Sequence, residues 1–425
     1  MKIHIRGGRV IDPANQIDAI QDLYIDNGRV LALGQLSGGF QADKVIAAEG
    51  LVVCPGLIDL QASLREPGFT QKGTIKTESA AAAAGGVTSL CCPPDTLPVL
   101  DTPAVAQLIQ DRAGQAGTTR VLPLGALTKG LEGEQLSNMV SLKEAGCIAF
   151  SNARKPIANN LTLMRCMEYA ATYDLLIVVQ SQDQALTDGG VAHEGRTASK
   201  LGLPGIPAAA ETLDVARYLV LAEHTGARIH FGQLTTVRAV QMVSAAKERG
   251  VKVSADTAIQ YLLLNDEYLA DFDSAYHVIP PLRDSVDQQG LGKELKNGAI
   301  QAICSDHQPQ DAAEKEAPFG AAVAGMIGLQ TLLPLSLKLV SEGVLSLSEV
   351  IAKLTIEPAR ILGLSQGQLA SGADADICIF DPQSEWVLNQ ESSLSLARNT
   401  PFFGQPLLGQ VCYTLKAGEL VFEKL

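Results

Sequence analysis

The sequence has few cations, few histidines and no long apolar run. Its 425 residues carry 33 Lys and Arg against 46 Asp and Glu, a formal net charge of −13 at pH 7. A phosphate backbone would meet a repulsive average field, so we expect no nucleic-acid partner. No window approaches the ~20 uninterrupted apolar residues that a membrane-spanning helix needs, so we expect no membrane partner either.

Histidine scarcity limits the possible metal sites. The chain has only six, at His4, His193, His224, His230, His277 and His307. Any metal site must draw on these or on carboxylates and thiols. The eight cysteines are scattered through apolar runs, and no charged start followed by an apolar segment opens the chain. We expect reduced, buried cysteines in a cytoplasmic protein.

The two ends of the chain alternate apolar and polar residues. With 46% hydrophobic residues, the chain can fold around a large core. Turn signals separate alternating runs at Asp26-Asn27-Gly28 near the start and at Lys416-Ala417-Gly418 near the end. We expect residues 1–53 and 368–425 to form one small composite β domain.

Between the ends, short apolar runs alternate with longer stretches of helical spacing. Runs typical of strands occur at residues 57–60, 87–91, 121–124, 147–150, 176–179, 228–231, 251–254 and 300–303. Helices are expected at 75–84, 102–116, 161–173, 208–224 and 236–249, and the leucine-rich stretches 329–339 and 345–354 are typical of core-facing helices. This rhythm predicts an α/β fold, a (β/α)8 TIM-type barrel over residues 54–367.

In such a barrel the chemistry lies just beyond the C-terminal ends of the strands. The polar residues predicted there are Gln61, Ser63, Arg65, Asp95, Ser151, Asn152, Gln180, Gln182, Asp183, Gln233, Gln260, Asp306 and His307. This mouth is polar but nearly devoid of titratable bases and metal ligands.

Several motifs resemble those of one enzyme family. They are Pro55-Gly56-Leu57-Ile58-Asp59-Leu60-Gln61-Ala62-Ser63, Leu64-Arg65-Glu66-Pro67-Gly68, Pro280-Pro281-Leu282-Arg283, Ser305-Asp306-His307 and Asp374-Ala375-Asp376-Ile377. The chain resembles the amidohydrolase superfamily and, within it, the class I dihydroorotases. These are zinc enzymes that interconvert carbamoyl aspartate and dihydroorotate.

The resemblance implies a metal site whose ligands this chain has lost. The family's metal-ligand positions correspond to Gln61, Ser63, Asn152, Gln180, Gln233 and Asp306, and only Asp306 keeps a ligand residue. Amide and hydroxyl oxygens are poor zinc donors, and one carboxylate cannot hold zinc alone. We therefore expect no zinc, no other cofactor and no catalytic residue. Cys91 and Cys92, on opposite faces of a strand, are expected to pack rather than react.

The substrate positions are altered too. Arg65 matches the family residue that grips the substrate carboxylate, but Asp95 and Ile279 replace two asparagines. We expect Arg65 to form an internal ion pair with Asp95 or Asp306, and His307 to keep a structural hydrogen bond.

These losses resemble non-catalytic dihydroorotase homologues that some bacteria keep as an assembly subunit of aspartate transcarbamoylase in pyrimidine biosynthesis. The resemblance implies the transcarbamoylase catalytic chain as a partner, and a homodimer within a larger hetero-oligomer. Two alternatives remain open: a metal-independent cyclic-amide hydrolase that uses Asp306 as general base, and a sensor subunit that binds a pyrimidine metabolite through Arg65 and the mouth glutamines.

Overall fold

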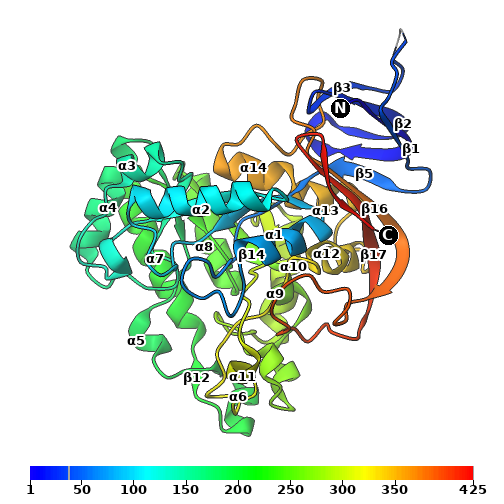
Figure 1. Cartoon of the computed structure of the whole chain (residues 1–425). Helices are drawn as coiled ribbons and strands as arrows, with labels where there is room; N and C mark the ends of the chain where they lie inside the picture. The colour runs from blue at the N-terminus through cyan, green and yellow to red at the C-terminus, as the bar shows by residue number, and fades with distance from the viewer. Residues whose placement is uncertain (37–38, 425) are drawn as a thin grey trace.

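The computed structural model describes residues 1–36 and 39–424. Segments from both ends of the chain form one eight-stranded sheet (Figure 1). Its strands run in the order β18 (Glu419–Glu423), β17 (Pro406–Lys416), β16 (Ile377–Val387), β5 (Val52–Pro55), β1 (Ile3–Asp12), β2 (Ile17–Asp26) and β3 (Arg29–Leu33), with β4 (Lys44–Ala47) paired to β1. The expected composite β unit is therefore confirmed.

The second eight-stranded sheet is a parallel barrel. Its strands run in the order β6 (Leu57–Asp59), β7 (Val87–Cys92), β8 (Arg120–Ala126), β9 (Ala149–Ser151), β10 (Leu176–Val179), β13 (Arg228–Phe231), β14 (Val253–Ala258) and β15 (Ala302–Cys304). A parallel bridge between Ala62 and His307 joins the first and last strands near the mouth. The predicted (β/α)8 barrel is confirmed.

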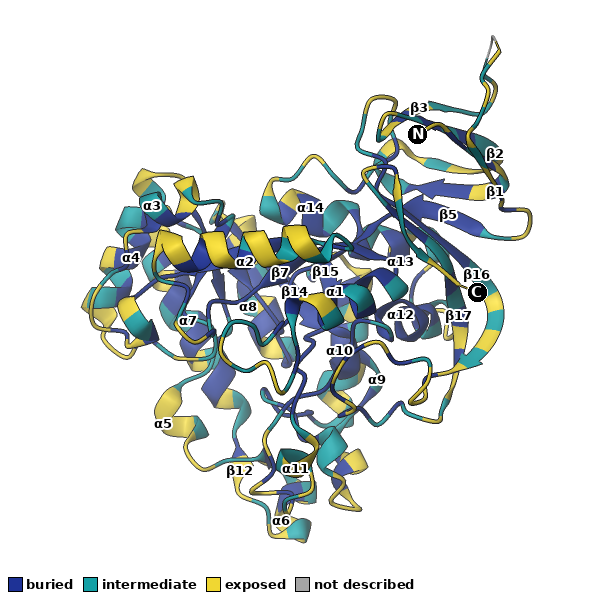
Figure 2. Ribbon diagram, viewed as in Figure 1, coloured by how far each residue is buried: buried dark blue, intermediate teal, exposed yellow. Residues whose placement is uncertain are grey.

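Helices surround this barrel and bury its strands (Figure 2). The longer ones are α1 (Ile75–Ala84), α2 (Pro103–Ala116), α3 (Met139–Glu144), α4 (Asn160–Thr172), α7 (Ala208–Thr225), α8 (Val237–Glu248), α10 (Ser285–Lys296), α12 (Leu332–Ser341), α13 (Leu347–Leu354) and α14 (Ile356–Leu362). Thr74 and Thr77 form a capping box at the start of α1, and Gly226, at φ 72°, ends α7.

Short elements occupy the connections around the mouth. They are α5 (Gln184–Thr187), α6 (Arg196–Leu201), α9 (Ile259–Leu263), α11 (Ala312–Lys315), the strands β11 (Ala192–His193) and β12 (Gly205–Ile206), and the 3-10 turns η1 (Pro13–Asn15), η2 (Lys129–Leu131), η3 (Asp266–Leu269) and η4 (Ser274–Tyr276).

The seventh barrel strand differs most from its prediction. It was expected at 251–254 but runs from Val253 to Ala258. The polar pair Asp256-Thr257 conceals it in the sequence, because Asp256 is buried inside the barrel against His230, 2.8 Å away.

The leucine-rich stretches and the cysteines lie largely as expected. Leu332, Leu333 and Leu335 in α12, and Leu354 in α13, are buried. All eight cysteines are free, and seven are buried, Cys412 being half-buried. Within the described residues, no helix is both long and apolar enough to cross a membrane.

Candidate functional site

The barrel topology brings the predicted mouth positions to one end of the molecule's central sheet. Gln61 and Ser63 follow β6, Asn152 follows β9, and Gln233 follows β13, all buried. Asp306 follows β15 and is completely buried. Gln180, directly after β10, is half-buried.

The surviving carboxylate is bound by an arginine. Arg154 Nη2 lies 2.5 Å from Asp306 Oδ1, and Arg154 Nη1 donates to the Ile279 carbonyl oxygen. Gln308 Nε2 donates to the other carboxylate oxygen at 3.0 Å, and Gln260 Nε2 lies 3.5 Å from that same oxygen. Asp306 therefore already has a fixed cation and two amide neighbours.

Burial sets the ionisation of Asp306. Burial raises its pKa to about 6, although the charge and hydrogen bond of Arg154 act in the opposite direction. Asp306 is thus mostly ionised at pH 7 and half-ionised near pH 6, and Arg154 is the group that favours its charged form most.

Sequence reasoning missed Arg154. It lies two residues after Asn152, one of the positions that the resemblance assigns to metal ligands, in Ser151-Asn152-Ala153-Arg154. The sequence signal that could have found it is an arginine after the fourth barrel strand, at the same mouth as the single acid Asp306, which needs a cation when it is buried.

Two of the other positions that the resemblance assigns to metal ligands, Asn152 and Gln233, contact the protein itself. Asn152 accepts a hydrogen bond from Thr128 Oγ1 at 2.7 Å and donates to the Lys155 carbonyl oxygen at 2.8 Å. The Gln233 amide nitrogen Nε2 lies 3.8 Å from Cys304 Sγ, and its backbone N–H donates to Asp256 at 2.7 Å. The side chains of Asn152 and Gln233 are therefore directed to neighbouring protein atoms.

A zinc ion does not fit this donor set. Gln61, Gln180 and Gln233 offer neutral amides, Asn152 is already hydrogen-bonded, and the Asp306 carboxylate is already paired with the Arg154 guanidinium. Within residues 1–36 and 39–424, no three His, Cys, Asp or Glu side chains are grouped to hold a metal.

Four mouth residues adopt a left-handed backbone that non-glycine residues rarely take. They are Arg65 (φ 63°), Ala153 (φ 51°), Gln233 (φ 52°) and Asp306 (φ 46°). Such conformations are energetically costly and cluster at functional sites. The strained backbone at these four positions is the kind that occurs at functional sites.

The expected ion pair of Arg65 is wrong. Arg65 Nε donates to the Pro309 carbonyl oxygen at 2.9 Å, and no described carboxylate forms an ion pair with its guanidinium. Asp306 is taken by Arg154, and half-buried Asp95 acts only at longer range. Burial lowers the pKa of Arg65, while the charge of Asp95 raises it.

Ile279 also lies at the mouth and is half-buried. Its side chain cannot replace an asparagine amide, but its backbone carbonyl binds Arg154. The same arginine thus contacts both Ile279 and Asp306.

His307 has the structural hydrogen bonds that the sequence predicted. Its Nε2 lies 2.9 Å from Glu78 Oε2, and its Nδ1 accepts the Gly328 N–H at 3.1 Å. The two buried residues tie the mouth to α1. Burial raises the pKa of Cys92 to about 12 and that of Cys91 further, so these thiols stay protonated as expected.

A second buried acid lies beneath the mouth. Asp59 accepts hydrogen bonds from the Ser305 hydroxyl and, at 2.9 Å, from the Ser305 backbone N–H. Burial raises its pKa to about 7, against the effect of these bonds. Asp59 joins the first and last barrel strands and is a structural group.

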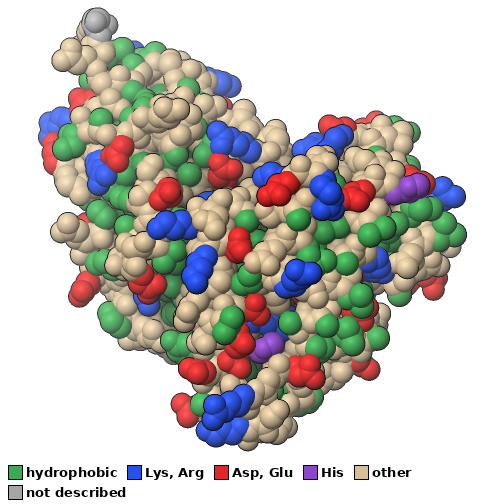
Figure 3. Space-filling model, turned by 180° about the vertical axis from the view of Figure 1, so that it is seen from behind, with side chains coloured by type: hydrophobic (Ala, Val, Ile, Leu, Met, Phe, Trp, Pro, Cys, Tyr) green, Lys and Arg blue, Asp and Glu red, His purple; other side chains and the backbone are tan. Residues whose placement is uncertain are grey.

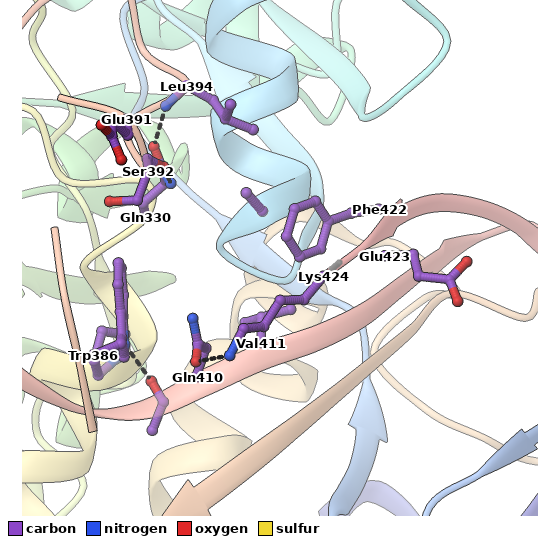
Figure 4. Close-up of a pocket in the computed structure, with 13 residues that line it drawn as sticks. Gln330, Trp386, Glu391, Ser392, Leu394, Gln410, Val411, Phe422, Glu423 and Lys424 are labelled. Carbon is purple, nitrogen blue, oxygen red and sulfur yellow. Dashed lines mark hydrogen bonds between the residues drawn. The ribbon is translucent and has the colours of Figure 1, made fainter. Parts of the chain in front are cut away.

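A cavity of about 400 Å³ lies away from the mouth, between α1, α12 and the strands β16 to β18. Figure 4 shows Gln410 and Lys424 between the rings of Trp386 and Phe422. Trp386 Nε1 donates to the Gly409 carbonyl oxygen at 2.9 Å, which fixes its ring. None of the predicted site residues lines this cavity.

Comparisons with known proteins agree with the motifs. Residues 50–238 match the dihydro-orotase-like family model, and residues 205–422 match the amidohydrolase family model. The chain is 51% identical over 423 residues to a dihydroorotase-like protein of Pseudomonas aeruginosa, covering 100% of both chains. The chain belongs to the dihydroorotase-like family of the amidohydrolase superfamily.

Other members of the dihydroorotase-like family bear the enzyme's name. A protein named dihydroorotase from Syntrophus aciditrophicus is 42% identical over 425 residues, covering 100% of both chains. The solved L-hydantoinase (dihydropyrimidinase) of Arthrobacter aurescens has a TM-score of 0.90 at 24% identity, covering 99% of this chain and 96% of that one. That likeness shows the barrel fold.

Proposed function

We propose that this dihydroorotase-related protein is catalytically inactive and serves as an assembly subunit of aspartate transcarbamoylase in the cytoplasm. The ion pair between Arg154 and Asp306 carries the first half of this proposal. The Arg154 guanidinium, 2.5 Å from Asp306, repels a divalent cation electrostatically. It also occupies the space beside the carboxylate that such a cation would need.

The chemistry of ring opening supports inactivity. Family members need a metal to lower the pKa of water from about 15.7 to about 7, which yields the attacking hydroxide. Here the positions that the resemblance assigns to metal ligands hold amides and a hydroxyl, and the two carboxylate oxygens of Asp306 accept hydrogen bonds from Arg154 and Gln308.

The assembly role rests on the resemblance to non-catalytic dihydroorotase homologues. A barrel without catalytic activity still has a packed interior that keeps it folded. Its outer surfaces can therefore still bind a partner protein. The Pseudomonas relatives, at 51% identity, are named dihydroorotase-like proteins, whereas relatives at 42% are named dihydroorotases. This division of names agrees with the proposal.

Assays on the purified chain test the inactivity. We expect no turnover of dihydroorotate, carbamoyl aspartate or hydantoins with or without added zinc, and well below one zinc per chain by metal analysis. The double substitution Gln61→His, Ser63→His should stay inactive, because Arg154 still occupies Asp306. Easily measured turnover in either protein, or stoichiometric zinc, would refute inactivity.

A sensor role is the second candidate. Gln180 Nε2, Ser181 Oγ and Gln182 Nε2 are buried after β10 without a hydrogen-bond partner among the described residues, as a polar ligand would require. Thermal-shift measurements with pyrimidine intermediates test it, because a ligand at about 100 times its Kd adds about 2.7 kcal/mol of stability. A saturable shift that Gln180→Ala abolishes would favour the sensor.

A further inference from the structure

The cavity beside the terminal sheet has two aromatic walls. Trp386, from β16, and Phe422, from β18, are half-buried and lie on opposite sides of it (Figure 4). Each side chain packs in part against the hydrophobic core. Within residues 1–36 and 39–424, no other ring stacks on either of them. Both rings therefore leave surface open to the cavity, on which a planar ligand can stack.

Hydrogen bonds hold the walls of the cavity in place. Trp386 Nε1 donates to the Gly409 carbonyl oxygen at 2.9 Å. Gln330 Oε1 accepts the Leu394 backbone N–H at 2.7 Å, and Gln330 Nε2 donates to the Ser392 carbonyl oxygen at 2.9 Å. The cavity of about 400 Å³ is thus preformed and has the size of a small-molecule site, so a ligand orders few side chains when it binds.

Donors at one end of the cavity lack protein acceptors. Gln410 Oε1 accepts hydrogen bonds from Lys424 Nζ and, at 3.3 Å, from Ser384 Oγ. The Gln410 amide nitrogen then has no acceptor among the described residues, and Lys424 Nζ keeps further N–H donors. Lys424 forms no ion pair with a described carboxylate, whereas its neighbour Glu423 is neutralised by Lys44, 2.9 Å away. This end of the cavity is therefore suited to an anionic acceptor.

The other end of the cavity offers an acceptor. Glu391 is exposed there beside Ser392, and Figure 4 shows it across the cavity from Lys424. A carboxylate accepts hydrogen bonds from the N–H groups of a ring or from an amine. A nitrogen heterocycle therefore fits this end better than a hydrocarbon ring does.

We propose that this cavity binds a planar nitrogen heterocycle that carries a carboxylate or a phosphate group. The ring stacks between Trp386 and Phe422, and its anionic group accepts hydrogen bonds from Gln410 Nε2 and Lys424 Nζ. This site is separate from the barrel mouth, and binding to it requires neither catalysis nor a transcarbamoylase partner.

The average charge of the molecule does not attract such a ligand. The formal net charge is −13, and the face of the described chain in Figure 3 mixes cationic and anionic side chains without an extended cationic patch. Nonspecific binding of anions is weakened by this field. An affinity that depends on Lys424 therefore identifies the cavity as the site.

Fluorescence of the purified chain tests the proposal, because Trp386 is the only tryptophan in the sequence. The probes are nicotinate, a pyridine carboxylate, and adenosine monophosphate, a purine phosphate, which distinguish the two anionic groups. We expect saturable quenching of Trp386 by at least one of them. The uncharged counterpart, nicotinamide or adenosine, should bind about 10-fold more weakly or worse, since it lacks the charge-assisted hydrogen bonds.

Substitutions in the cavity should change the Kd of that probe. Lys424→Ala should raise it about 10-fold or more, whereas Lys424→Arg should keep most of the affinity. Phe422→Leu should raise it about 5-fold or more through the loss of stacking. Lys143→Ala, at an exposed lysine of α3 far from the terminal sheet (Figure 1), is the matched control. Lys143→Ala and the mouth variant Gln180→Ala should both leave the Kd unchanged.

Three results would overturn the proposal. They are the absence of saturable quenching by both anions, equal binding of the charged and uncharged rings, and a Kd that Lys424→Ala leaves unchanged. Loss of binding in Gln180→Ala would also overturn it, because the ligand would then lie in the barrel mouth.

Discussion

At the scale of residues, Arg154 changes the character of the mouth. A metal site and an arginine–carboxylate pair both neutralise Asp306, but a guanidinium is fixed to the chain and brings no activated water. Arg154 is therefore the residue whose removal should matter most for the stability of the mouth.

Arg154→Met should destabilise the fold by about 3–5 kcal/mol at high pH, since it leaves the buried Asp306 without its cation. The folded-state pKa of Asp306, about 6, already exceeds the ordinary 3.8, and the variant raises it further. In the variant, the folded state binds a proton on Asp306 more tightly than the unfolded state does. The decrease in unfolding free energy should therefore be small at about pH 6 and large at about pH 8.5. Urea unfolding at both pH values measures it.

Arg165→Met is the control for this prediction. Arg165 pairs with Glu168 at 2.6 Å on the exposed surface, where such pairs are worth about 0–1 kcal/mol. Equal losses in the two variants, or a loss for Arg154→Met that does not grow with pH, would contradict the role given to Arg154.

At the scale of elements, α12 joins the two sheets. It packs against β17 of the terminal sheet and against α13 beside the barrel. The apolar face of α12 is buried almost completely, which is why its leucines were readable from the sequence as core residues.

Leu335→Ala in α12 should cost about 2–5 kcal/mol of unfolding free energy, because it removes buried methyl groups and leaves a cavity. Leu108→Ala in α2, where the leucine is 38% exposed, should cost about 1 kcal/mol or less. Urea denaturation compares the two variants. Similar decreases in unfolding free energy for the two variants would contradict the close packing of α12 between the barrel and the terminal sheet.

The elements were more predictable than the contacts among them. Hydrophobic spacing and Gly226 placed α7 to within a residue, because helix limits are local properties. The pairing of Arg154 with Asp306 joins residues 152 positions apart and depends on the left-handed backbone at Ala153 and Asp306, which no local pattern reveals. The predicted ion pair of Arg65 failed for the same reason, because the sequence does not show that Arg154 pairs with Asp306.

At the scale of the whole molecule, the contacts that hold the fold together lie apart from the side chains of the mouth. The barrel is closed by hydrogen bonds between the segments that follow its first and last strands, and α12 packs against the sheet formed from both termini. The mouth can therefore lose its ligands while the outer faces stay in place. Substitutions such as Asp306→Ala or Gln180→Ala should accordingly leave assembly with a partner unchanged.

The mass of the purified chain mixed with the aspartate transcarbamoylase catalytic chain tests the central claim most directly. Light scattering after gel filtration at micromolar concentration should give one species heavier than either component alone, and the same species with Asp306→Ala. Two separate species at the masses of the unmixed proteins would contradict the assembly role.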